Sequence, residues 1–389
     1  MTAFDPDRLS TADLGYFFDD RHQKLAGQLL AASKMVEAAD GHAAVARAMG
    51  SAGLYRWFVP DDGKVDVRCL CVIREMLGYI SPLADAVFAV HGLGSYPIVL
   101  AGSEQQKSLL DGCRSGERIG AFALTEPEAG SDVASMKTSA TADGDDFVLN
   151  GDKTLISNVG IASHYIVFAK VGPEADPQPG HRNITAFVVD SGAEGLTEVP
   201  FEVNVDHPIG ALEFRNCRVS STAVLGEVGG GFGLAMQTLD SFRISVGAAA
   251  VGMARRALDE AVAHVTSRVQ FGKTLGEQQL VQAHLADSAT QLDAARLLVL
   301  RAAHSKDHSS GDKSERTRLS SEAAKAKLFA TEAAQTIIDR AVQLHGGRGV
   351  TSGEVVENLY RAIRPLRIYE GTSEILRLII GRAIIGGVR

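Results

Sequence analysis

The chain has 389 residues, with 39 Lys plus Arg against 47 Asp plus Glu, so its formal net charge is −8. Hydrophobic residues make up 45% and charged residues 22%, which allows a large buried core and excludes a wholly disordered chain. The acidic balance also argues against a nucleic-acid-binding protein, because phosphate backbones bind to basic surfaces. Roughly two or three domains are expected at this length.

No membrane partner, secretory signal or metal centre is predicted. The N-terminal residues are acidic and lack a basic stretch followed by an apolar run, so no signal or transit peptide is expected. We find no apolar stretch of the ~20 residues that span a bilayer. The 11 histidines form no HExxH or similar ligand spacing. The four cysteines show no zinc-ligand pairing, so we expect reduced, structural thiols in a cytoplasmic protein.

The first block, residues 1–119, is predicted to be a helical domain. Apolar residues recur there at helical spacing, for example at Leu25 and Leu29. Ser103, followed by Glu104 and an apolar pair, is typical of a helix start.

The second block, residues 120–225, is predicted to be a β-domain. Short runs rich in β-branched and aromatic residues alternate with turn-forming residues. The runs are IGAFALTE, DFVLNGDKTLIS, YIVFAKV, ITAFVVD and LEFRNCRV. We expect antiparallel strands that pack as a barrel or sandwich.

The third block, residues 226–389, returns to helical periodicity and is predicted to be a helical bundle with Ala at many packing positions. The expected helices cover residues 232–268, 279–305, 317–345, 353–363 and 373–385. Helices, then strands, then helices indicate an α+β protein rather than a βαβ sheet.

Three motifs have a structural and a functional interpretation. GEVGGGFG at 226–233 lacks the Lys-Ser/Thr ending of a phosphate loop, so a flexible link is favoured. LTEPEAGSD at 124–132 is either a turn after a strand or a loop whose backbone approaches a ligand. YEGTSEI at 369–375 either caps a helix, with Glu370 solvated, or places Glu370 at a pocket, with Gly371 permitting close approach.

Five segments in this order resemble those of the acyl-CoA dehydrogenase family, over nearly the whole chain. The segments are ALTEPEAGSD, GDKTLISN at 151–158, RVQFGKTLGEQQ at 268–279, QLHGGRGV at 343–350 and YEGTSEILRLII at 369–380. The resemblance implies non-covalent FAD between the β-domain and the C-terminal helices, in a homotetramer or homodimer. It also implies α,β-dehydrogenation of an acyl-CoA thioester, with electrons passing to an electron-transferring flavoprotein.

In that resemblance Glu370 matches the catalytic base that removes the α-proton while a hydride goes to flavin N5. Burial would raise the pKa of this carboxylate and strengthen it as a base. Some relatives carry the base on the long helix instead, but that position is Phe242 here, and Phe cannot take a proton. The substrate-side matches are Ser131, Asp240, Arg243, Tyr369 and Gly371.

The flavin-side matches come from all five segments. They are Phe122, Leu124, Thr125, Gly130, Ser131, Leu155, Ile156, Ser157, Arg268, Phe271, Gln279, Gln343, Gly346, Gly347, Thr372 and Glu374. Arg268 has a charge suited to pyrophosphate. The resemblance implies that its segment reaches the FAD of a partner subunit.

Three departures from the family pattern leave alternatives open. Leu155 stands where the family usually has Trp, which suggests an oxygen-using acyl-CoA oxidase or flavin monooxygenase as an alternative. Ser157 replaces the usual Thr and keeps the hydroxyl. The stretch 207–219 is shorter than usual, so an acyl-carrier-protein (ACP) thioester is an alternative substrate. A non-enzymatic pseudoenzyme is the remaining possibility.

Overall fold

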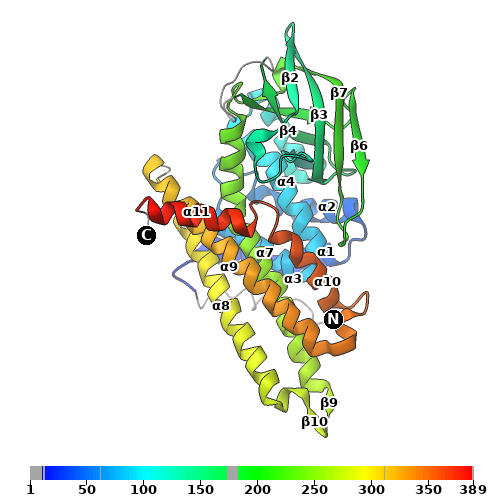
Figure 1. Ribbon diagram of the computed structural model, residues 1–389, viewed down its shortest axis with the longest axis vertical. Coiled ribbons are helices and arrows are strands. Elements are labelled where there is room, and N and C mark those ends of the chain that lie inside the picture. Colours follow the sequence, from blue (N-terminus) through cyan, green and yellow to red (C-terminus); the bar gives the residue numbers. More distant parts are fainter. Residues whose placement is uncertain (1–10, 12–13, 62, 173–182, 311, 388–389) are drawn as a thin grey trace. The chain divides into compact units, whose positions relative to one another are not determined.

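The computed structural model of the protein describes residues 11, 14–61, 63–172, 183–310 and 312–387 (Figure 1). The described chain divides into two compact units. One unit comprises residues 1–37, 66–85 and 243–389, and the other comprises residues 38–65 and 86–242. These units cut across the three sequence blocks, so the domain boundaries at 119/120 and 225/226 stay a prediction.

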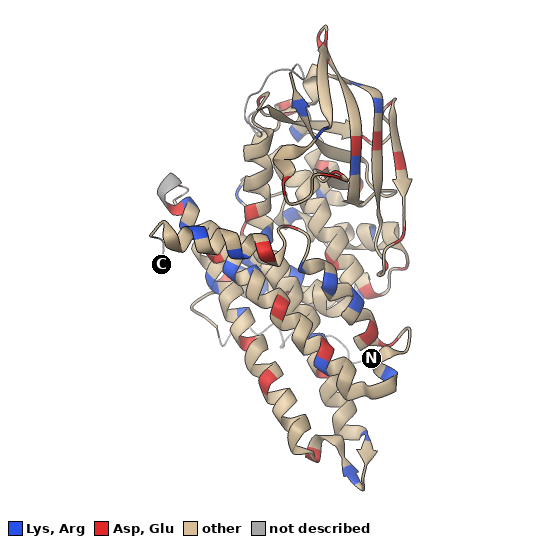
Figure 2. Ribbon diagram, viewed as in Figure 1, with Lys and Arg blue, Asp and Glu red and all other residues tan. Residues whose placement is uncertain are grey.

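The first unit is helical apart from one short hairpin. Its elements are α1 (Asp20–Glu37), α3 (Val67–Ile80), α8 (Gln279–Asp307), α9 (Lys313–His345), α10 (Val355–Leu366) and α11 (Ser373–Ile385), with β9 (Val269–Gln270) and β10 (Lys273–Thr274). Helices α8 and α9 run side by side, and α10 and α11 both pack on α9 (Figure 1). Basic and acidic residues are interspersed along these helices (Figure 2).

Small residues allow close helix packing in this unit. The long helix α7 (Gly231–Ser267) contributes its residues from Arg243 onward. A Cβ atom added at Gly252 of α7 would lie 2.0 Å from the carbonyl oxygen of Glu75 on α3. Only glycine permits that approach, so α3 and α7 touch through their backbones.

The second unit contains the sheet. Its strands are β1 (Gly120–Ala123), β2 (Ser139–Asp143), β3 (Asp146–Ser157), β4 (His164–Val171), β5 (Ile184–Asp190), β6 (Leu196–Pro200), β7 (Ile209–Ser220) and β8 (Val224–Leu225). The strand order is β6-β7-β3-β2-β4-β5-β8, with β1 paired to β4. The helices of this unit are α2 (His42–Ser51), α5 (Glu104–Lys107) and α6 (Leu110–Ser115), with parts of α4 (Pro82–Ala101) and α7.

The α+β fold class is confirmed, with helices, a central sheet and a helical bundle in the predicted order. The sheet differs from the expectation in one respect, because it is mixed rather than purely antiparallel. Strands β1 and β2 both pair with β4 in parallel. Parallel pairing becomes possible because other strands intervene in the chain between these partners.

The expectation about apolar stretches is wrong for α4. Among the described helices, α4 is long and apolar enough to cross a membrane by length and composition. However, 72% of its most apolar window is buried within the protein, as is typical of a core helix.

The glycine-rich segment links β8 to α7, as expected, and part of it packs on the sheet. Gly231 begins α7, and a Cβ atom there would lie 2.7 Å from the backbone nitrogen of Ala186 on β5. The Gly229 N–H donates to the hydroxyl of Thr185, 2.9 Å away. These contacts tie the link to the sheet.

Candidate active site

Glu370 lies in a tight turn between α10 and α11. It has a left-handed backbone, with φ at 52°, and Gly371 follows with φ at 97°. The next residue, Thr372, caps α11, because its hydroxyl accepts a hydrogen bond from the Ile375 N–H. The capping pattern in YEGTSEI is therefore confirmed. The cap directly follows the turn that carries Glu370.

Cations from two long helices hold the carbonyl groups of this turn. The Lys327 ammonium on α9 donates to the carbonyl oxygens of Tyr369 (2.5 Å) and Gly371 (2.6 Å). The Arg243 guanidinium on α7 donates to the carbonyl oxygen of Glu370 (3.1 Å). Three successive carbonyl groups are thus fixed by residues distant in the sequence.

Glu370 is half-buried, and one oxygen of its carboxylate is shielded from water. Its Oε2 atom is buried and has no hydrogen-bond partner among the described residues. Burial raises the pKa of Glu370, although the charges of Arg74, Lys327 and Arg243 oppose that shift. A buried carboxylate oxygen without a partner is unusual in folded proteins and calls for a function, such as accepting a proton.

A buried ion pair also acts on Glu370. Arg74 on α3 and Asp85 on α4 are buried and make a bidentate contact, with N–O distances of 2.8 and 2.9 Å. Arg74 also donates to the hydroxyl of Ser245. The charges of Arg74, Lys327 and Arg243 all lower the pKa of Glu370, that of Arg74 most, whereas the charge of Asp85 raises it.

In the other unit, an ion pair anchors the loop after β1. The Glu126 carboxylate accepts hydrogen bonds from the backbone N–H groups of Lys137 (2.5 Å) and Thr138 (3.0 Å). The Lys153 ammonium on β3 contacts the same carboxylate at 2.8 Å and donates to the Leu124 carbonyl oxygen. Glu126 and Lys153 are both buried, so the ends of this loop are held in one place.

In the same unit, three residues offer groups whose chemistry fits a flavin ring. Leu155 lies in a β-bulge between β3 and β7, with φ at 55° and 57% of its surface exposed. Such a bulge re-aims a side chain out of the sheet. The nearby Ser157 hydroxyl contacts Nε2 of His207 at 2.6 Å, and a Cβ atom on Gly130 would meet nothing within 4 Å. An apolar contact, a hydroxyl and open backbone fit the predicted cofactor.

The remaining predicted flavin residues lie in separate places. Phe122 packs against Phe168, with ring centroids 4.9 Å apart. Leu124 and Ile156 are buried, and Thr125 is half-buried. The exposed residues of the loop and of the helical unit are Ser131, Arg268, Phe271, Gln279, Gln343, Gly346, Gly347 and Glu374.

The hairpin that carries Phe271 stands apart from the Glu370 turn. It lies at one end of the α8–α9 pair, away from α11 (Figure 1). Phe271 is 95% exposed with φ at 54°. The Phe271 side chain therefore takes no part in the core of its unit.

The structure brings four of the predicted substrate and catalytic residues of the helical unit together, namely Arg243, Tyr369, Glu370 and Gly371. Asp240 is half-buried on α7, and Phe242 is fully buried. The sequence interpretation missed the buried charged residues that support both segments. These residues are Arg74, Asp85, Glu126, Lys153 and Lys327. Glu126 lies in ALTEPEAGSD and Lys153 lies in GDKTLISN. Their place in these two segments is the sequence signal that could have identified them.

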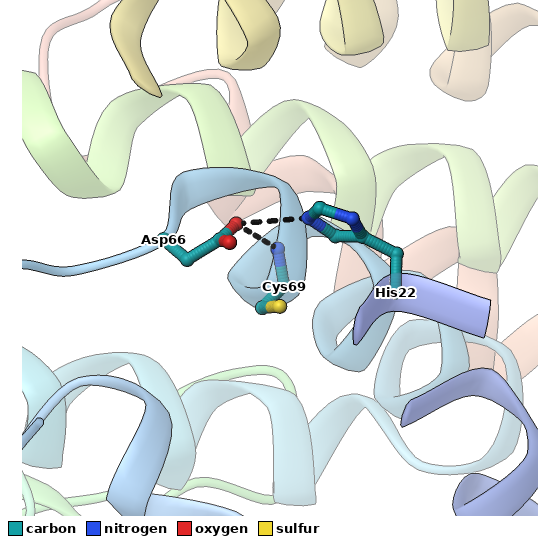
Figure 3. A group of neighbouring side chains, drawn as sticks. All are labelled: His22, Asp66 and Cys69. Carbon is teal, nitrogen blue, oxygen red and sulfur yellow. Dashed lines mark hydrogen bonds and ion pairs between the residues drawn. The ribbon is translucent and has the colours of Figure 1, made fainter. Parts of the chain in front are cut away.

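Within the described residues, His22, Asp66 and Cys69 lie close enough to share a metal ion (Figure 3). Their contacts are those of a helix cap. Asp66 caps α3 by accepting from the Cys69 N–H (3.0 Å), and it contacts Nε2 of His22 at 3.1 Å. The two ring nitrogens of His22 already face the carboxylates of Asp19 (2.9 Å) and Asp66 (3.1 Å). Burial raises the pKa of the Cys69 thiol, which opposes thiolate ligation.

Two family models match parts of the chain. Residues 121–217 match the acyl-CoA dehydrogenase middle domain, and residues 229–385 match its C-terminal domain. The chain is 38% identical over 345 residues to the probable acyl-CoA dehydrogenase FadE25 of Mycobacterium tuberculosis, covering 87% of this chain and 86% of that protein.

Two solved structures show the same fold over nearly the whole chain. Butyryl-CoA dehydrogenase from Megasphaera elsdenii has a TM-score of 0.85 and 31% identity, covering 95% of this chain and 99% of that one. The prolyl acyl carrier protein oxidase AnaB has a TM-score of 0.83 and 26% identity, covering 94% and 99%. The resemblance found in the sequence is confirmed, and the chain belongs to the acyl-CoA dehydrogenase family of FAD-dependent oxidoreductases.

Proposed function

We propose that the protein converts an acyl-CoA thioester into the trans-2-enoyl thioester, with Glu370 as the base that removes the α-proton. The observation that carries the proposal is the Glu370 Oε2 atom, which is buried and has no partner among the described residues. Burial raises the pKa of Glu370 above that of a solvated glutamate. A stronger base is better matched to the weakly acidic carbon next to a thioester.

The backbone of the same residue is suited to the developing charge. No hydrogen bond between described residues takes up the Glu370 N–H, while the Glu370 carbonyl oxygen accepts from Arg243. A preorganised N–H donor stabilises the negative charge that forms on the thioester oxygen as the α-proton leaves. Glu370 would therefore contribute two groups, the carboxylate to the proton and the amide to the enolate.

FAD, when bound, supplies the acceptor for the hydride from the β-carbon. In the sheet unit the residues proposed to hold it are Phe122, Leu124, Thr125, Gly130, Ser131, Leu155, Ile156 and Ser157. In the helical unit they are Arg268, Phe271, Gln279, Gln343, Gly346, Gly347, Thr372 and Glu374. The support is the exposure of Leu155 and Phe271 and the hydroxyl group of Ser157.

Anaerobic mixing with acyl-CoA tests the base directly. Glu370→Gln keeps the size of the side chain and removes its basicity, so the variant should retain FAD but lose bleaching of the flavin. The matched control is Glu357→Gln, since Glu357 lies on α10 and pairs with Arg361. Normal bleaching in Glu370→Gln would refute the proposed role.

A second candidate keeps the flavin and the base but changes the acceptor or the carrier. The exposed Leu155 favours oxygen access, as in an oxidase or flavin monooxygenase, and the fold is shared with a prolyl acyl carrier protein oxidase. Peroxide formed in proportion to turnover would support it, whereas strict dependence on an electron-transferring flavoprotein would exclude it. Turnover of one acyl group on CoA and on ACP decides the carrier.

We further propose a homotetramer or homodimer, with the segment around Arg268 and Phe271 reaching the FAD of a partner subunit. The exposure of both residues supports this assembly. We also propose that an electron-transferring flavoprotein accepts the electrons and that the protein is cytoplasmic.

A further inference from the structure

Lys327 is a fully buried lysine of the helical unit. It lies near the middle of α9, has 0% of its surface exposed, and makes no ion pair within 4.0 Å among the described residues. Its ammonium instead donates to two carbonyl oxygens, those of Tyr369 and Gly371. It also lies 5.9 Å from the centroid of the Tyr369 ring. A buried cation is expensive unless its charge is used, so its position calls for an explanation.

The two carbonyl groups that Lys327 holds flank Glu370 on either side. Glu370 has a left-handed backbone, a conformation that costs a non-glycine residue energy unless its surroundings enforce it. Clamping the residue before and the residue after Glu370 from a single atom supplies that enforcement. Arg243 adds a third contact at the carbonyl of Glu370 itself.

The charged residues that act on Glu370 come from four helices. Of those that the structure describes, Lys327 is the one that bonds to the carbonyl groups on both sides of Glu370. Arg74 of α3 is held in a bidentate pair by Asp85 of α4, and the two charges act on Glu370 in opposite directions. Arg243 of α7 bonds to the backbone of Glu370, and Tyr369 belongs to the same turn. Lys327 of α9 supplies a positive charge that no described carboxylate neutralises by direct contact.

We propose that Lys327 is a positioning residue for the dehydrogenation: it clamps the 369–371 turn and holds the Glu370 carboxylate in its ionised, proton-accepting form. This inference rests on the proposed role of Glu370 as base. The electrostatics agree with the geometry, since the charge of Lys327 lowers the pKa of Glu370 against the effect of burial. Burial in turn lowers the pKa of Lys327 to about 7, with the Glu370 charge acting in the opposite direction.

Two substitutions separate the clamp from the charge. Lys327→Gln keeps a hydrogen-bond donor without a charge, whereas Lys327→Met removes both. The matched control is Lys325→Met, because Lys325 lies two positions earlier on α9 and therefore points to another face of the helix.

The measurement is the rate of anaerobic flavin bleaching by acyl-CoA between pH 5 and 9, with FAD content measured for every variant. Loss of a nearby positive charge raises the pKa of Glu370, so the acid limb should move to higher pH by about one unit in both Lys327 variants. That shift lowers the rate on the acid limb about tenfold. Lys327→Met should also lose part of the limiting rate at high pH, because its turn is no longer clamped, and Lys325→Met should match the parent.

The two levels of the proposal fail in different ways. A parental pH profile and rate in Lys327→Gln and Lys327→Met, with Glu370→Gln inactive, overturns the role of Lys327 alone. Normal bleaching in Glu370→Gln overturns the proposed base. If Lys327→Met does not fold with FAD, the acid limb of Lys327→Gln still decides the charge role, because an unshifted limb contradicts it.

Discussion

Removing Lys153 should destabilise the sheet unit more than any ordinary lysine substitution. The Lys153 ammonium has 0% exposure and lies 2.8 Å from Glu126, which is itself buried. Lys153→Met leaves the Glu126 carboxylate buried with only the backbone N–H groups of Lys137 and Thr138 as partners. Breaking a buried pair by removing one partner costs about 3–5 kcal/mol. Because two donors remain, we expect a loss of about 3 kcal/mol in the free energy of unfolding.

Urea unfolding followed by tryptophan fluorescence measures this loss. Trp57 is the single tryptophan of the chain and lies in the same unit as the ion pair. The matched control is Lys170→Met on β4, where the half-buried side chain should contribute less than about 0.5 kcal/mol. The double variant Glu126→Gln/Lys153→Met should lose less than the sum of the two single variants, because both charges leave together.

Two results would refute the reasoning about this pair. One is a Lys153→Met variant within about 0.5 kcal/mol of the parent, which is the range of surface substitutions. The other is strict additivity in the double variant, which would mean that Glu126 and Lys153 do not interact.

Burial lowers the pKa of His91 to about 3 and that of His164 to about 4, so the unfolded chain binds more protons than the native one from about pH 6.5 downward. The free energy of unfolding should therefore fall as the pH drops from 6.5 to 4. In His164→Gln the urea midpoint should fall less over this pH range, and an equal fall in the variant and the parent contradicts the reasoning. Gly371→Ala places a side chain at φ 97° and should lower the free energy of unfolding by about 1–3 kcal/mol. The control Gly381→Ala on α11 should be tolerated, because a Cβ atom there meets nothing within 4 Å. Equal melting temperatures of the two variants would refute this difference. All four cysteines are buried free thiols, so thiol reagents should label them in urea but not in the native protein, and rapid native labelling would contradict this burial.

The order and the type of the helices and strands could be predicted because their sequence signals are local. The 3.6-residue periodicity of the third block predicts α7, α8 and α9 closely, and Thr372 before Ser373 predicts the start of α11. Pairing of strands distant in the chain has no such local signal. The parallel partners of β4 were therefore missed, and the buried, apolar α4 was underestimated.

The candidate site likewise combines residues that have a local sequence signal with residues that have none. Glu370 could be named from its segment, because the acidic residue, the glycine and the cap are adjacent in the sequence. Lys327 could not, since its partners lie 42 and 44 residues further along the chain and meet it only when α9 and the 369–371 turn pack together. Arg74 and Asp85 look like ordinary charged helix residues in the sequence, and only their burial reveals the pair.

Deuterium incorporation tests most directly whether the Glu370 carboxylate takes the α-proton. The protein is incubated anaerobically with acyl-CoA in D₂O, without an electron acceptor, and the recovered acyl-CoA is examined by mass spectrometry. The parent protein should introduce deuterium at the α-carbon, because a carboxylic acid exchanges its proton with solvent before returning it. Glu370→Gln should bind acyl-CoA and introduce none. Incorporation by Glu370→Gln at the parental rate would contradict the assignment and place the base elsewhere.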